Sequence, residues 1–117
     1  HKEAIYGTVA GIPKEHFYGP STLSKDKTML YLFVKGDPKG EVVIRGLKNK
    51  INRIWVVGNG TKLSHKVVGS VYWSHYPGIK YIQVPEYVLD DEMTVIAVLL
   101  DGKVDLYRED GAVIESN

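Results

Sequence analysis

The stretch GLKNKINRIWVVGNGTKLSHK, residues 46–66, carries the pattern that indicates the fold of this chain. Its beginning is polar and basic, and residues 53–57 around Trp55 then alternate between the two faces that a β-strand presents. Gly58-Asn59-Gly60 follows, and an Asn-Gly pair accepts the positive φ values that a tight hairpin turn requires. The stretch therefore predicts a strand, a reversal of the chain, and a second short strand at residues 61–68.

Short apolar runs separated by turn residues recur along the chain. Nowhere do apolar residues repeat at helical spacing for ten or more residues, and residues 85–91 are expected to form one helical turn at most. About eight short strands at intervals of roughly 8 to 12 residues are typical of a sandwich or a barrel. We predict an all-β fold, a two-sheet antiparallel β-sandwich of about eight short strands. The runs expected to form these strands are residues 28–34, 41–45, 53–57, 61–68, 70–74, 79–84, 93–100 and 103–108, with shorter segments at residues 8–10 and 112–114.

Length and composition bound the class of protein. A chain of 117 residues is long enough for one domain with a real core, and its 44% hydrophobic and 25% charged residues are a globular composition. Fifteen basic and 14 acidic residues leave a net charge of +1, so no whole-molecule field favours nucleic acid. The absence of cysteine excludes disulfides and thiol chemistry, and no apolar run reaches the ~18 residues of a membrane span. We expect neither nucleic-acid binding nor a membrane span.

The chain divides into two unequal parts at the level of pattern. Residues 1–24 have little periodicity and are punctuated by glycine and proline, so we expect an irregular lead-in with one short strand near residues 8–10. Residues 25–117 are expected to form the β-sandwich. The sequence begins at His1 without a methionine or a signal peptide pattern, which favours a fragment of a longer protein.

Three of the predicted strands are apolar on both faces. Residues 28–34, 53–57 and 93–100 all show this, whereas a sandwich strand usually buries one face and wets the other. Covering helices would explain such runs, but the sequence has none. We therefore expect Tyr31, Phe33 and Trp55 to lie on an outer face that a loop, a partner or a further domain covers.

No motif for catalysis or for a metal ion stands out. His16, His65 and His75 lack the spacing of a zinc site, and the acidic run at residues 90–92 is more typical of a solvated turn than of a calcium loop. The aspartates fall mostly in turns, where they cap the backbone, and neither a nucleophile elbow nor a phosphate loop is present. We expect no metal, no cofactor and no catalytic residue. A local basic group is interpreted as a solvated loop; it comprises Arg45, Lys48, Lys50 and Arg53.

Aromatic residues gather at positions 72–76. Exposed tryptophan and tyrosine rings can bind the apolar face of a sugar, so Tyr72, Trp73 and Tyr76 are candidate carbohydrate-binding residues. Alternation puts Trp73 on the opposite face from Tyr72 and Tyr76, so one set at most can face a ligand. A tryptophan in a sandwich strand is more often part of the core.

Several segments together resemble a known family. They are similar to the C-terminal part of α-L-fucosidases of glycoside hydrolase family 29, particularly bacterial enzymes of the Bacteroides type, over nearly the whole chain. The segments that carry this resemblance are Glu3-Ala4-Ile5-Tyr6-Gly7-Thr8, His16-Phe17-Tyr18-Gly19-Pro20, Tyr31-Leu32-Phe33-Val34, Gly46-Leu47-Lys48-Asn49-Lys50-Ile51, Val57-Gly58-Asn59-Gly60-Thr61-Lys62-Leu63 and Leu99-Leu100-Asp101-Gly102.

The resemblance implies a β-sandwich that follows a catalytic (β/α)8-like barrel in a retaining enzyme acting on terminal α-L-fucosyl groups. The nucleophilic aspartate and the acid/base glutamate of that family belong to the barrel, and no segment of this chain matches their motifs. The resemblance thus implies a non-catalytic domain that packs on and stabilises the barrel and borders the substrate entrance, in a periplasmic or secreted protein. Its partners would be that barrel and fucosylated glycans. The alternatives are an autonomous carbohydrate-binding module and a small enzyme using a carboxylate pair.

Overall fold

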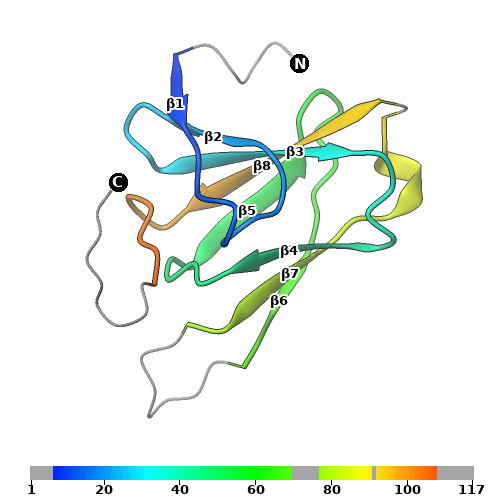
Figure 1. Cartoon of the computed structure of the whole chain (residues 1–117). Helices are drawn as coiled ribbons and strands as arrows, with labels where there is room; N and C mark the ends of the chain where they lie inside the picture. The colour runs from blue at the N-terminus through cyan, green and yellow to red at the C-terminus, as the bar shows by residue number, and fades with distance from the viewer. Residues whose placement is uncertain (1–6, 70–76, 91, 108–117) are drawn as a thin grey trace.

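Eight strands and one short 3-10 helix make up the computed structural model, which describes residues 7–69, 77–90 and 92–107. Figure 1 shows the strands as two layers, with the turn of 3-10 helix at one end. The elements are β1 (Thr8–Ala10), β2 (Ser21–Ser24), β3 (Met29–Lys35), β4 (Glu41–Arg45), β5 (Ile51–Val56), β6 (His65–Val68), β7 (Ile79–Gln83), η1 (Glu86–Val88) and β8 (Met93–Leu100).

The two layers are antiparallel sheets of unequal size. The larger has the strand order β1-β2-β3-β8-β5 and the smaller the order β4-β7-β6. Every pairing between neighbouring strands is antiparallel. The prediction of an all-β fold with two antiparallel sheets is therefore confirmed.

Strand β8 is an inner strand of the larger sheet, between β3 and β5. It pairs with β3 over seven positions, from Met29 opposite Leu99 to Lys35 opposite Met93, and its other edge pairs with β5. Six of its eight residues are buried, including both members of neighbouring pairs such as Val95 and Ile96. A central strand covered on both faces needs apolar side chains at successive positions, which explains the apolar run in the sequence.

The main core lies between the two sheets. In β3, Leu30, Leu32 and Val34 point into it with no exposed area, while the intervening residues remain partly exposed. The smaller sheet contributes Val42, Ile44 and Ile82, which are also fully buried. This alternation follows from the period of two along a strand.

The segment between β1 and β2 joins the two sheets along one side. The amide of Arg45 in β4 donates to the carbonyl oxygen of His16 at 2.8 Å, and the His16 ring is itself buried. Its Nδ1 lies 2.8 Å from the carbonyl oxygen of Arg45, and since that oxygen can only accept, Nδ1 must carry the proton. Phe17 next to it is 1% exposed and belongs to the core.

Three details of the predicted arrangement are wrong. The lead-in is not irregular throughout, because Ser21–Ser24 forms β2 and pairs with β3; the strand at Thr8–Ala10 is confirmed. The predicted strand at residues 61–68 is split, since Lys62 bridges to Trp55 in the larger sheet and His65–Val68 belongs to the smaller one. That split lets the chain cross between the layers after the Gly58-Asn59-Gly60 turn, which is confirmed.

The third error concerns the strand expected at residues 103–108. The described part of this run, residues 103–107, does not pair back along β8, because β3 and β5 already occupy both of its edges. The chain runs instead beside residues 46–48, where Leu106 bridges to Leu47. The single helical turn expected at residues 85–91 appears as η1. The segments 70–74 and 112–114, also expected as strands, lie outside the described residues.

Asn49 organises this end of the sandwich. Its side-chain nitrogen donates to Asp101 Oδ1 at 2.9 Å and to the carbonyl oxygen of Lys103 at 3.0 Å, and its oxygen accepts from the amide of Asp105 at 2.7 Å. The residue is 7% exposed, so these bonds satisfy a polar group that burial would otherwise penalise. The Asn49 side chain and the amide of Lys50 hold the pKa of Asp101 below its usual range.

Truncation of the core should be costly at Leu32 and harmless nearby. Leu32→Ala removes a fully buried side chain and should lower the free energy of unfolding by about 2–5 kcal/mol. Lys35→Ala, at an exposed position of the same strand, should change it by no more than about 0.5 kcal/mol. Urea denaturation followed by tryptophan fluorescence measures both; equal effects would contradict this account of the core.

A pair of glycine substitutions separates backbone strain from contact with His16. Gly36 and Gly46 share a φ of +69°, but a Cβ on Gly36 meets nothing within 4 Å, whereas one on Gly46 would lie 3.1 Å from His16 Nδ1. Gly36→Ala should cost about 1–2 kcal/mol for the left-handed conformation alone. Gly46→Ala should cost more, because the bond to Arg45 holds the His16 ring in place. Thermal melts compare the two variants, and a smaller loss for Gly46→Ala would contradict the packing described.

The carboxylate of Asp101 should contribute stability that acid removes. Because its folded pKa is lowered, the contribution is present above the unfolded pKa, near 4, and is lost as the pH falls through the folded value. Asp101→Asn should therefore destabilise the chain at pH 7, and its difference from the parent should shrink toward pH 3. Denaturant midpoints at several pH values measure this. A gap that stays constant from pH 7 to pH 3 would show that the charge is irrelevant.

Candidate functional surfaces

The outer face of the larger sheet carries a second, smaller apolar cluster. Val57, Val95 and Ala97 are its buried members, and four larger side chains pack against them while remaining partly exposed. The register explains the grouping, because Ala97 lies opposite both Tyr31 and Trp55 on its two neighbouring strands. We call this the outer apolar face; its partly exposed residues are Met29, Tyr31, Phe33 and Trp55.

The three residues predicted to form an interface therefore lie together on one surface. Tyr31, Phe33 and Trp55 come from β3 and β5, which are separated in the sheet by β8. They belong to the outer cluster and not to the main core between the sheets. Their role in an interface stays a prediction.

A buried hydroxyl adjoins the same face. Thr22 in β2 lies opposite Tyr31 in the register, so both side chains point to the outer side. The Oγ1 atom of Thr22 is buried and has no hydrogen-bond partner. A buried polar atom without a partner costs about 1–3 kcal/mol, so this edge of the face is polar and unsatisfied.

A pocket of about 510 Å³ opens at the β5 margin of the outer apolar face. Arg53 and Trp55 form one wall, and the Gly58-Asn59-Gly60 turn forms the other. The guanidinium carbon of Arg53 lies 5.4 Å from the centroid of the Trp55 ring, a cation–π distance. A second pocket, of about 350 Å³, shares Gly58 and Asn59 with the first and extends toward Tyr87.

The outer face of the smaller sheet has a more polar character. Tyr81 on β7 is partly exposed, and the ammonium group of Lys66 lies 5.6 Å from its ring centroid. The same ammonium is 3.7 Å from Glu41, which also accepts a hydrogen bond from Gln83 at 2.9 Å. These side chains therefore interact with one another on the outer side of the smaller sheet.

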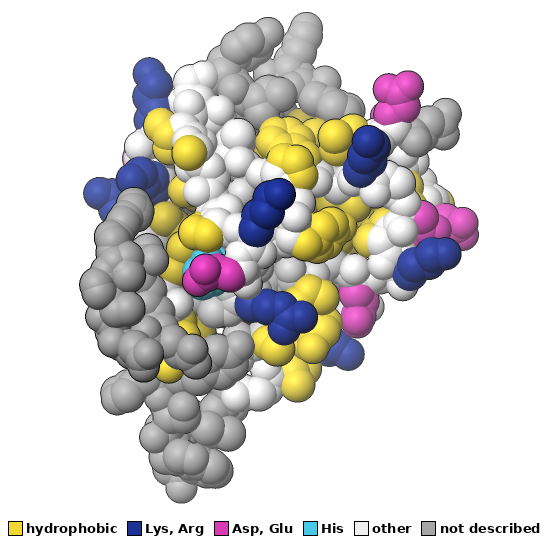
Figure 2. All heavy atoms as spheres, in the orientation of Figure 1, with side chains coloured by type: hydrophobic (Ala, Val, Ile, Leu, Met, Phe, Trp, Pro, Cys, Tyr) yellow, Lys and Arg dark blue, Asp and Glu magenta, His cyan; other side chains and the backbone are white. Residues whose placement is uncertain are grey.

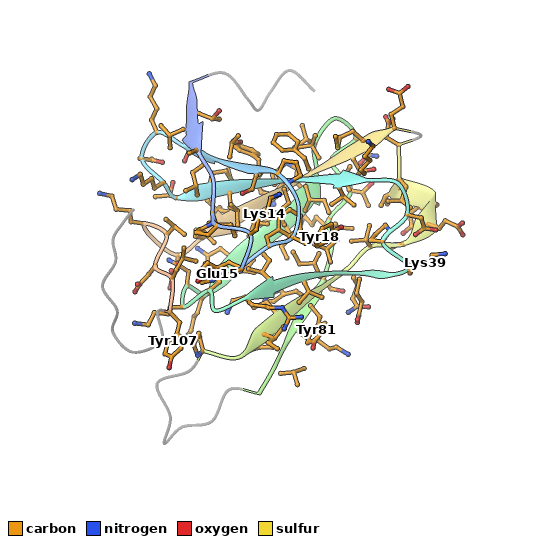
Figure 3. The ribbon with its side chains drawn as sticks, viewed as in Figure 1. Lys14, Glu15, Tyr18, Lys39, Tyr81 and Tyr107 are labelled. Carbon is orange, nitrogen blue, oxygen red and sulfur yellow. The ribbon has the colours of Figure 1, made fainter. Side chains whose placement is uncertain are left out.

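Figure 2 shows a third surface, where apolar and basic side chains alternate across the middle of the molecule. In the same view, Figure 3 places Lys14 and Tyr18 near the centre of this face, between the two sheets. Tyr18 is 58% exposed and its ring contacts that of Phe17, with the centroids 4.8 Å apart. This contact anchors Tyr18 to the core while its outer edge stays in solvent.

Two inward-facing basic side chains have lowered pKa values because of burial. Lys80 is 5% exposed and donates to the carbonyl oxygen of Leu47 at 2.9 Å. Burial lowers the pKa of Lys80, and Asp101 opposes this shift. Burial and the nearby charge of Lys80 lower the pKa of His65. Both groups face the interior of the sandwich, so we assign them a structural role.

The predicted carbohydrate-binding residues Tyr72, Trp73 and Tyr76 lie outside the described residues, as does His75 of the histidines considered for zinc. His16 and His65 are on different elements. Within residues 7–69, 77–90 and 92–107, no three histidine, aspartate or glutamate side chains are close enough to hold a metal ion. In the same ranges no helix is long and apolar enough to cross a membrane. Sequence patterns indicated Trp55 but not the pocket beside it. The residues that line this pocket come together only when β5 and the Gly58-Asn59-Gly60 turn fold into a hairpin.

The chain was compared with protein families, curated proteins and solved structures. No protein-family model matches the sequence, and no curated protein matches it. Among solved structures, the chain is similar to α-L-fucosidase isoenzyme 1 from Paenibacillus thiaminolyticus, with a TM-score of 0.63 and 22% sequence identity over 85% of this chain. The match covers 23% of that protein, so the chain spans about a quarter of its length. The likeness establishes a shared fold.

Proposed function

We propose that this chain is a non-catalytic β-sandwich domain of an α-L-fucosidase. In this proposal it packs on the catalytic barrel through its outer apolar face, stabilises the barrel and borders the substrate entrance. The face itself is the observation that carries the proposal. A free-standing sandwich exposes mainly polar side chains on its outer faces, whereas large apolar side chains lie on the outer side of β3 and β5. The structural likeness to one quarter of an α-L-fucosidase supports the same assignment.

The energetics of the outer apolar face favour a cover. Val57, Val95 and Ala97 are already buried there beneath larger side chains, so a partner would meet a packed and preformed surface. Each additional Å² of apolar surface that it removes from water contributes about 25 cal/mol. Docking of a preformed surface loses little conformational entropy, since the strands that carry it are held by ladders on both sides of β8.

Catalysis would belong to the remainder of the parent protein. The more specific assignment, the C-terminal domain of a family 29 enzyme of the Bacteroides type that retains configuration, rests on the sequence segments that resemble that family. Under this assignment neither catalytic carboxylate lies in the chain, which is inert alone. The autonomous carbohydrate-binding module remains the alternative. Sugar binding through its predicted residues Tyr72, Trp73 and Tyr76 would distinguish it.

Activity and docking can be tested with two forms of the protein. The 117-residue chain should not hydrolyse 4-nitrophenyl α-L-fucoside. The long polypeptide, which is this chain expressed together with the coding sequence that flanks it in the gene, should hydrolyse this substrate. Phe33→Thr should lower the melting temperature of the long polypeptide more than that of the chain alone, since Phe33 would be covered only in the former. A threonine keeps the β-propensity and removes the apolar ring.

Tyr81→Thr is the matched control. Tyr81 is likewise a partly exposed aromatic residue in the middle of a strand, but on the outer face of the other sheet. Tyr81→Thr should shift the melting temperature of the 117-residue chain and of the long polypeptide equally. Equal shifts for Phe33→Thr as well would contradict docking through the outer apolar face, and hydrolysis by the 117-residue chain would contradict the non-catalytic assignment.

A further inference from the structure

From the geometry of the β5 margin we infer that the pocket beside Trp55 binds an anionic saccharide, a pyranose that carries a carboxylate or a sulfate group. The choice of a saccharide over other anions rests on the proposed function; the preference for an anion and the position of the site rest on the residues themselves. The pocket and its lining were defined above from Arg53, Trp55 and the Gly58-Asn59-Gly60 turn.

The register places a second cation on the same face as Trp55. Lys62 bridges antiparallel to Trp55, and the flanking hydrogen bonds run from the Val56 amide to the Thr61 oxygen and from the Leu63 amide to the Ile54 oxygen. These bonds make Trp55 and Lys62 a non-hydrogen-bonded pair, the closer of the two kinds, in which side chains share one face. Arg53, two residues before Trp55, lies on that face as well.

The Trp55 indole ring thus shares its face with two exposed cations. Arg53 and Lys62 are both exposed, while Trp55 is half-buried against the outer cluster and fixed by it. Among the described residues that line the pocket, none is acidic. Since an arginine can bind a carboxylate or a sulfate through two parallel hydrogen bonds, the local positive charge complements an anionic group.

The turn supplies the remaining wall and keeps it open. Asn59 Oδ1 accepts from the Thr61 amide at 2.9 Å, which fixes the turn in a single conformation. Gly60 has a φ of +73°, and a Cβ placed there would meet nothing within 4 Å, so the backbone borders open space. A ring can lie against the indole with its polar groups toward this rigid turn.

The number of rings favours a sugar over a nucleic acid. Single-stranded nucleic acid binds by stacking successive bases on several aromatic side chains along a basic groove. The pocket is lined by one aromatic ring and one cation, Arg53, and a second cation, Lys62, lies opposite Trp55 on the same face; this arrangement suits one sugar ring with one anionic substituent. The net charge of +1 gives no wider field for a polyanion.

Titration of the 117-residue chain with matched sugars tests this inference. Methyl β-D-glucuronide and galactose 6-sulfate should shift the indole signal of Trp55 in NMR spectra saturably at millimolar concentration, and Trp73→Phe assigns the two indole signals. Methyl β-D-glucoside and galactose, which lack only the charge, should bind at least about tenfold more weakly. Arg53→Gln and Lys62→Gln should each reduce that preference.

Lys66→Gln serves as the matched control, because Lys66 lies over Tyr81 in the same way on the other sheet and should leave the preference unchanged. Four outcomes would overturn the inference: no saturable shift, equal binding of neutral sugars, equal binding of inorganic sulfate, or tighter binding of oligothymidylate. The comparison of Phe33→Thr with Tyr81→Thr does not depend on the pocket. Failure of the titration alone would therefore leave the proposed function standing, and failure of that comparison alone would leave the site standing.

Discussion

The antiparallel pairing of β8 with β3 is the constraint on which the structure depends. Seven consecutive pairs fix the register of the two strands, and β5 occupies the other edge of β8. A shift by one residue would move Leu30, Leu32 and Val34 from the core to the outer side and expose three fully buried side chains. With both edges filled, β8 cannot accept the strand that follows Asp101-Gly102. The end of the chain is therefore directed toward residues 46–48, where the side chain of Asn49 satisfies the freed backbone groups.

The same constraint produces the two unlike faces of the larger sheet. Side chains alternate along β3, so filling the main core with one set necessarily places Met29, Tyr31 and Phe33 on the outside. The residues of β8 beneath them, Val95 and Ala97, are apolar and buried. A surface with this composition is suited to a covering partner. The smaller sheet differs because Lys66, Glu41 and Gln83 satisfy one another on its outer side.

The two proposed binding surfaces meet where the chain crosses from the larger sheet to the smaller one. After the Gly58-Asn59-Gly60 turn, residues 61–63 continue the larger sheet and β6 joins the smaller one. This crossing leaves the edge of β5 with only a short partner, so the Trp55 ring forms both a margin of the outer apolar face and a wall of the pocket. Docking to a barrel and binding of a sugar would then take place side by side, as expected for a domain that borders a substrate entrance.

The amino-acid sequence by itself determined the strand-rich class, the turn at Gly58-Asn59-Gly60, and the doubly apolar character of residues 28–34 and 93–100. These features depend on local chemistry: alternation of side chains, positive φ at glycine and the length of apolar runs. Tertiary structure decided which strands are neighbours, because pairing joins residues far apart in the sequence and each edge of a strand accepts one partner only. Alternation along single strands was enough to indicate Tyr31, Phe33 and Trp55 as outer residues. It could not indicate β2, the split at Lys62, or the pocket that Arg53 and Trp55 form with the Gly58-Asn59-Gly60 turn.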